Sequence, residues 1–219
     1  LDLPRLDRML DIDATSQLAT FEAGVTGPSA ERMLLGHGHT LGHYPQSYAR
    51  ATLGGYVATR SAGQASTGFG RIDDLVVRLR AATPVGEIEL GTGTPNAAGP
   101  DLRALFVGSE GALGVLTEVT LRVRPRPTAT HYEMWAFPSF SAGLEVVRGL
   151  VGADAAPDVL RLSDETETLT GQLLAGLKGR AAALLTRLRH IRTPAFCVLG
   201  WEGEHDVELT GAIALPDGD

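Results

Sequence analysis

Alternating hydrophobic and polar positions predict strands along much of this chain. Residues 17–23 alternate in this way, and residues 113–123 do so strictly. The apolar face of the second of these strands is expected to hold Val115, Thr117, Val119, Leu121 and Val123. Further runs predict strands over residues 72–83, 87–90, 131–137, 158–162 and 195–201. The turn Pro84–Gly86 predicts that the strands beside it form a hairpin.

Apolar positions three and four residues apart predict helices between these strands. The segment Pro28–Gly36 is expected to begin at its proline and to end at its glycine. A short helix is expected over residues 100–106, and a capped helix start is expected at Ser163–Glu165, with helix continuing over residues 181–190. Residues 138–151 predict an amphipathic helix. Its buried stripe is expected to hold Phe140, Leu144, Val147 and Leu150.

The segment from His37 to Gly70 is glycine-rich and has little periodicity. Long segments of this kind in compact proteins are commonly functional. The pair Gly54–Gly55 predicts a turn with positive φ, in which backbone amides can approach a ligand such as a phosphate. A tight turn that binds nothing is the alternative. A second glycine pattern, Gly108–Gly114, leads into a strand instead of following one, so it does not predict a dinucleotide fold of the Rossmann type.

Two prolines, Pro125 and Pro127, end the long alternating strand and predict a domain boundary. We therefore expect one domain over residues 1–127 and a second over residues 128–219. The first residues already have the pattern of a domain interior, so we expect the chain to be a piece of a longer protein.

Composition and charge exclude several classes of protein. The 219 residues include 19 Lys and Arg against 26 Asp and Glu, a net charge of −7, whereas nucleic-acid binding needs clustered cations. No apolar run approaches the roughly 20 residues that span a bilayer, and residues 1–10 lack the apolar core of a signal peptide. Cys197 is the only cysteine, so a cytoplasmic location is expected, and its apolar neighbours predict a buried, inert thiol.

Two polar clusters are interpreted as structural. His37, His39 and His43 lie in a loop without a supporting carboxylate or cysteine, so no metal site is predicted. The alternating row Arg122, Arg124 and Arg126 predicts a solvated strand face.

Two blocks of sequence, taken together, are specific enough to indicate a protein family. They are HYPQSYARATLGGYVATRSAGQASTGFGRIDDLV and GPDLRALFVGSEGALGVLTEVTLRVRP, supported by FEAGVTG, AFPSF and APDVLRLSD. This set resembles the FAD-linked oxidases of the vanillyl-alcohol-oxidase type (PCMH-type FAD-binding proteins), and among them the alkyldihydroxyacetonephosphate synthases. The resemblance implies an α+β fold. It would comprise the second half of a two-subdomain FAD-binding domain, with an antiparallel sheet flanked by helices, followed by the start of an α/β cap domain.

The resemblance also implies which residues bind FAD. The glycine-rich pyrophosphate loop of the family is expected before Leu1, and the family's catalytic tyrosine and histidine run are expected beyond this chain. Residues matching the flavin and pyrophosphate contacts are Gln46, Ser47, Tyr48, Ala49, Arg50, Ala51 and Thr52, followed by Thr59, Arg60, Ser61 and Ala62. Those expected along the adenosine and flavin side are Glu110, Gly111, Ala112, Leu113, Gly114, Val115 and Leu116.

The same resemblance implies a function. An arginine important for activity in the synthases falls on Arg161, which is expected to hold an anionic substrate group. On the residues alone, an ion pair with Asp164 is the alternative. The implied reaction exchanges an acyl for an alkyl chain on dihydroxyacetone phosphate through a flavin N5 adduct, in ether-lipid synthesis. A flavin-dependent D-2-hydroxy-acid dehydrogenase and a noncatalytic module are the alternatives. A lipid-phosphate or small-molecule substrate, peripheral membrane contact and a homodimer are further expectations.

Overall fold

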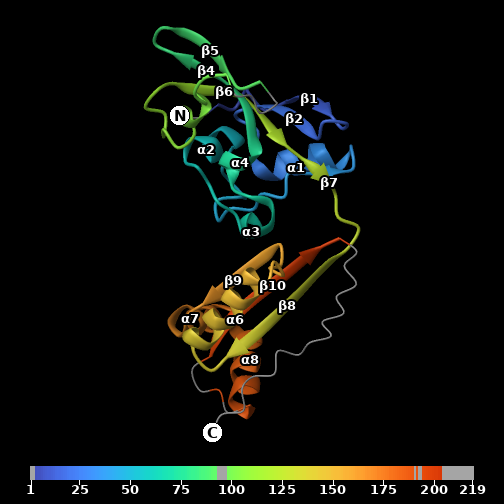
Figure 1. Ribbon diagram of the computed structural model, residues 1–219, viewed down its shortest axis with the longest axis vertical. Coiled ribbons are helices and arrows are strands. Elements are labelled where there is room, and N and C mark those ends of the chain that lie inside the picture. Colours follow the sequence, from blue (N-terminus) through green and yellow to red (C-terminus); the bar gives the residue numbers. More distant parts are fainter. Residues whose placement is uncertain (1–2, 93–97, 190, 192–193, 204–219) are drawn as a thin grey trace.

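The computed structural model describes residues 3–92, 98–189, 191 and 194–203. In this part of the chain two larger antiparallel sheets, each with helices packed on it, lie at opposite ends of an elongated molecule (Figure 1). The expectation of an α+β fold with helix-flanked antiparallel sheets is confirmed. We call the part from β1 to β7 the first lobe and the part from β8 to β10 the second lobe.

The first sheet has the strand order β1-β2-β6-β4-β5. Its strands are β1 (Met9–Asp13), β2 (Leu18–Glu22), β4 (Val76–Thr83), β5 (Gly86–Leu90) and β6 (Val115–Arg122). The hairpin of β4 and β5 turns where predicted, at Gly86, which has a φ of 128° that suits glycine. One large core lies against this sheet. Its most deeply buried side chains are Phe21, Leu34, Leu53, Tyr56, Ile72, Leu79, Val119 and Leu121.

Strand β6 departs from the strict alternation that the sequence suggested. On the neighbouring strand β4, Arg80 is opposite Glu118 and Ala81 is opposite Leu116. Thr117 therefore lies opposite no residue of β4 and forms a bulge. The bulge shifts the alternation by one residue. Leu116 is therefore buried with Val119, Leu121 and Val123, whereas Val115 is 37% exposed. The prediction that Val115 and Thr117 share the apolar face is wrong for this reason.

Short helices and a ribbon complete the first lobe. They are α1 (Gly27–Leu35), β3 (His39–Thr40), α2 (Leu53–Ala58), α3 (Ser66–Phe69), α4 (Ile72–Leu75), α5 (Arg103–Phe106) and β7 (Arg124–Pro125), with β3 paired to β7. The predicted strand over residues 72–83 is wrong in its first four residues, which form α4. The carboxylate of Asp74 accepts the backbone N–H of Arg71 at 2.9 Å, which stabilises this helical turn before the strand.

The second lobe has a three-stranded sheet in the order β8-β10-β9. Its strands are β8 (Thr130–Phe137), β9 (Val159–Ser163) and β10 (Ala195–Glu202). Its core is small. The buried side chains at its centre are Phe137, Ala195, Cys197 and Leu199. The prediction that Cys197 is buried is confirmed, and burial raises the pKa of its thiol.

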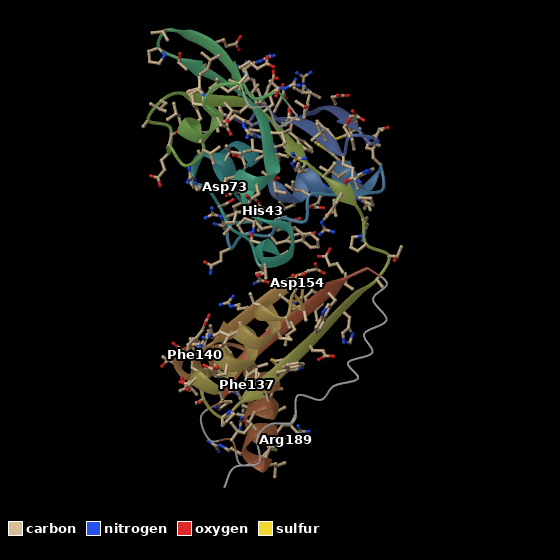
Figure 2. The ribbon with its side chains drawn as sticks, viewed as in Figure 1. His43, Asp73, Phe137, Phe140, Asp154 and Arg189 are labelled. Carbon is tan, nitrogen blue, oxygen red and sulfur yellow. The ribbon has the colours of Figure 1, made fainter. Side chains whose placement is uncertain are left out.

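Helix α6 (Phe140–Gly152) packs on one face of this sheet. The predicted stripe is wrong in its first half, because Phe140 and Leu144 are 37% and 38% exposed. Figure 2 labels Phe140 and the buried Phe137. The face that contacts the core instead holds Ala142, Val146, Val147 and Leu150. Gly143 lies at its centre, where an added Cβ would come 2.7 Å from the Leu162 side chain.

Helices α7 (Glu165–Leu174) and α8 (Gly176–Leu188) form a pair, in which α7 packs against β9 and β10 of the second sheet. The predicted cap is confirmed, because the Asp164 carboxylate accepts the N–H of Glu167 at 2.7 Å. Several leucines of this pair are more than half exposed: Leu169, Leu173, Leu174, Leu177, Leu184, Leu185 and Leu188. The chain crosses from one lobe to the other between β7 and β8, but the division into domains at residue 127 stays a prediction.

Candidate functional site

Helix α2 is the element around which the predicted site residues gather. Residues 46–52 lead into it through tight turns, in which the Ser47 carbonyl accepts the N–H groups of Arg50 and Ala51 at 3.0 and 2.9 Å. Thr52 begins the helix, since its hydroxyl accepts the Gly55 N–H at 3.1 Å. The side chains of Gln46, Ser47, Ala49 and Arg50 are exposed, which leaves this segment open to a ligand.

The glycine pair has a different role from the predicted one. Gly54 and Gly55 lie in the first turn of α2, and neither has a positive φ. The Gly54 N–H donates to the Ala23 carbonyl at 2.8 Å, and an added Cβ would come 2.8 Å from the Ala23 Cβ. The prediction of a positive-φ turn is therefore wrong. The close approach that Gly54 permits is between α2 and the end of β2.

The end of α2 brings the second and third predicted segments together. The Ser61 N–H donates to the Tyr56 carbonyl at 3.0 Å. The Glu110 N–H donates to Ala58 at 2.9 Å, and the Arg60 guanidinium donates to the Val107 carbonyl at 2.8 Å. Residues 59–62 and 110–113 thus lie beside one another. Of the third segment, Leu116 is buried in the first core, so its side chain packs there.

A buried histidine supports this arrangement. His43 is 2% exposed, and one of its ring nitrogens, Nε2, lies 2.7 Å from the Ser61 hydroxyl. Its ring also meets the Tyr56 ring edge-on, with centroids 5.3 Å apart. Burial lowers the pKa of His43 to about 4, so the ring is neutral near pH 7. Figure 2 shows His43 in the part of the first lobe that faces the second.

Glu31 of α1 fixes the loop that carries His43. Its carboxylate accepts the Thr40 hydroxyl at 2.7 Å and the N–H groups of Leu41 and Gly42 at 3.2 and 3.1 Å. Sequence reasoning missed both this carboxylate and the His43–Ser61 contact. No local signal marks Glu31, because a glutamate in the first turns of a helix is ordinary.

Two hollows flank these segments. One, of about 550 Å³, lies between β2, α1 and the start of α2. Its polar lining holds one carboxylate, that of Asp7, beside Thr26, Ser29, Arg32, Arg50 and Thr52. Arginines and hydroxyls of this kind suit an anionic, hydroxyl-bearing ligand. Across the part of the chain that the structure describes, no three His, Cys, Asp or Glu side chains form a metal-ligand cluster.

Arg161 lies in β9, opposite Val198 of β10. Its guanidinium forms an ion pair with Glu167 of α7, instead of with Asp164, which caps that helix. Arg161 also lines a second hollow, of about 400 Å³, whose lining includes apolar Met134, Phe196 and Val198. Gln64 of the first lobe lines the same hollow, two residues after Ala62. Arg161 and the segment that leaves α2 thus border the same hollow.

The chain is similar to known proteins in sequence and in fold. Residues 1–91 match the family model described as an FAD binding domain. The chain is 40% identical to an alkyldihydroxyacetonephosphate synthase of Trypanosoma brucei brucei over 168 residues, which are 77% of this chain and 27% of that protein. It is 32% identical to the synthase of Dictyostelium discoideum over 217 residues, 94% of this chain and 36% of the relative.

A solved structure of an alkyldihydroxyacetonephosphate synthase is also similar, with a TM-score of 0.81 and 30% identity over 92% of this chain and 38% of that one. The chain thus spans about a third of the length of the curated relatives it matches. In the described ranges, no helix has both the length and the apolar character needed to cross a bilayer.

Proposed function

Because residues 1–91 match the FAD binding domain family model, we propose that the segments around α2 hold FAD in an enzyme of the alkyldihydroxyacetonephosphate synthase type. The first lobe is then the second subdomain of the flavin domain, and the second lobe is the start of the cap. Bound FAD would supply a ring that accepts an electron pair at N5. The chain's own residues bind and orient it.

The residues fit this cofactor in their chemistry. The exposed segment Gln46–Thr52 and the hollow beside it offer hydroxyls and the Arg32 and Arg50 guanidinium groups, which suit a pyrophosphate and a ribityl chain. The neutral His43 ring holds the Ser61 hydroxyl in one orientation, so that residues 59–62 present a fixed edge. Glu110–Leu113, exposed beside that edge, complete the third side.

The observation that carries the proposal is the hollow that Arg161 shares with Gln64. A guanidinium beside an apolar surface suits a substrate with an anionic head and a long chain. In our proposal Arg161 leaves Glu167 and binds the phosphate of an acyl-dihydroxyacetone phosphate, while Met134, Phe196 and Val198 contact its chain. The reaction would exchange the fatty acid for a fatty alcohol, with no net change in oxidation state.

Turnover without an electron acceptor tests this proposal. The flavin-loaded full-length protein would receive an acyl-dihydroxyacetone phosphate and a long-chain alcohol. We expect an ether product and one released fatty acid per turnover, with no reduction of an added dye. Dye reduction with a D-2-hydroxy acid, and no ether product, would instead identify a dehydrogenase.

Arg161→Ala gives the residue-level test. We expect kcat/KM to fall by about a hundredfold or more, because a charge-assisted contact to the substrate is lost. Arg148→Ala is the matched control, since Arg148 is an exposed arginine of the second lobe that pairs only with Glu145, three residues before it, among the described residues. Full activity of Arg161→Ala with FAD retained would refute the role of Arg161.

A further inference from the structure

A partly buried ion pair joins the two lobes. Arg124, in β7 of the first lobe, places its Nη2 atom 2.6 Å from the carboxylate of Glu202, at the end of β10 in the second lobe. The two side chains are only 21% and 8% exposed. The guanidinium also lies over the Phe69 ring of α3, 3.6 Å from the ring centroid. The prediction of a solvated arginine row is therefore wrong at Arg124.

A backbone contact lies beside this pair. The Gly68 N–H of α3 donates to the Asp158 carbonyl at 2.9 Å, just before β9 begins. The Asp158 carboxylate in turn accepts the Glu202 N–H at 2.8 Å. An added Cβ on Gly68 would come 2.6 Å from the Asp158 Cα, so only glycine permits this approach. Helix α3, the start of β9 and the end of β10 thus meet at one junction.

The surroundings leave the Arg124 guanidinium little freedom. The guanidinium lies against Gly42, in the space that a Cβ on this residue would occupy. Gly42 has a φ of 67°. The loop at Gly42 is held in turn by Glu31. Arg124 Nε is buried and has no hydrogen-bond acceptor among the residues described. Removing the Glu202 carboxylate would therefore leave a largely buried cation without its counter-ion, which is unfavourable.

Along the chain, the junction lies near both parts of the candidate site. Arg161 follows Asp158 by three residues along β9, and Phe69 follows Ala62 by seven residues. Any rotation of the second lobe about this junction would move Arg161 relative to the segments around α2. We propose that Arg124 and Glu202 are positioning residues that fix Arg161 relative to the segments around α2. This inference rests on the proposed function.

Hydrogen exchange in the flavin-loaded full-length protein tests the junction directly. Glu202→Gln and Arg124→Glu should each speed exchange of the Gly68 and Glu202 backbone amides by about tenfold or more, because the contact opens locally. The charge-exchanged double variant Arg124→Glu/Glu202→Arg should restore most of the protection, because the pair forms again with its charges reversed. Arg122→Glu, which changes an exposed arginine of the neighbouring strand, should alter neither amide.

Activity and flavin content provide the second readout. We expect kcat/KM to fall about tenfold in the single variants and to recover in the double variant, while FAD stoichiometry stays unchanged. Exchange that rises equally at Val119 and Leu121, deep in the first core, would show a merely structural role and overturn the proposal. Unchanged exchange at Gly68 would also overturn it.

Two further results, an unfolded variant and a protein without flavin, also have a defined meaning. Where Arg124→Glu yields no folded protein, Glu202→Asp replaces it. The shorter carboxylate should give amide exchange rates that are intermediate between those of the original protein and of Glu202→Gln. Rates equal to those of Glu202→Gln would count against the ion pair. If the original protein binds no flavin and produces no ether, the proposed function fails, whereas the exchange result still decides whether the junction holds the lobes together.

Discussion

The two lobes hold their parts of the candidate site in different ways. In the first lobe, the segments around α2 rest on a large core that includes Phe21, Leu53 and Tyr56. In the second lobe, Arg161 lies on a sheet with a small core, next to a helix pair whose leucines are exposed. Among the residues that the structure describes, its guanidinium is held by one ion pair near the surface. The comparison suggests that the first lobe fixes its site internally, whereas Arg161 owes its position to the junction at Arg124.

Core truncations should show the largest difference between the lobes. Leu121 and Leu199 are both fully buried, one in each core. We expect Leu121→Ala to lower the free energy of unfolding by about 3–5 kcal/mol and Leu199→Ala by about 2–3 kcal/mol. The second loss is smaller because fewer large side chains surround the space left at Leu199. Denaturant unfolding, with hydrogen exchange as the probe in each lobe, measures the two losses in free energy. A larger loss at Leu199 would contradict the ranking of the cores.

Acid should weaken the first lobe through His43. Its pKa is about 4 in the folded protein against 6.5 when exposed, so the unfolded chain binds a proton that the folded one does not. Stability is therefore lost as the pH falls from 6.5 towards 4, by roughly 3 kcal/mol in total at about 1.4 kcal/mol per unit. His43→Gln should remove this part of the pH dependence. An identical slope in that variant would contradict the assignment.

A glycine pair inside α2 tests how closely the first lobe is packed. Gly54→Ala would bring a Cβ within 2.8 Å of Ala23, so we expect a loss of about 1–3 kcal/mol in stability and weaker FAD binding. Gly55→Ala is the neighbouring control, since the nearest atom is 3.3 Å away. It should change stability by less than about 1 kcal/mol. Thermal unfolding of the two variants, compared side by side, decides between close packing and a flexible turn.

Helix caps provide the smallest effect and the sharpest contrast. Thr52→Ala and Asp164→Ala should each cost about 1 kcal/mol of stability, because each removes an acceptor for a helix N–H. Only Thr52→Ala should also weaken FAD binding, since Thr52 lies in the proposed flavin site and Asp164 does not. Flavin fluorescence titration separates the two. Equal FAD affinities would argue against a flavin contact at Thr52.

Local signals in the sequence predicted most of the elements. The β4–β5 hairpin, the proline in the first turn of α1 and the Asp164 cap depend on neighbouring residues alone. Features that depend on distant partners were missed. The bulge at Thr117 arises from pairing with β4, and the stripe of α6 is set by where the second sheet lies.

The candidate site shows the same division. The segments that we propose to hold FAD could be selected from sequence motifs, but the contacts that support them could not. His43 meets Ser61 across 18 residues, and Arg124 meets Glu202 across the two lobes. Such pairs form only when the fold is complete. The residues next to His43 and Arg124 in the sequence therefore do not indicate which partners these side chains will meet.

The visible absorption spectrum of the purified full-length protein, before and after added FAD, tests the central claim most directly. We predict oxidised flavin bands in the protein, FAD in the supernatant after acid precipitation, and loss of the bands in a variant that disrupts the entry to α2, such as Gly54→Val. A colourless protein that stays colourless after FAD is added would contradict the assignment of these segments to a flavin site.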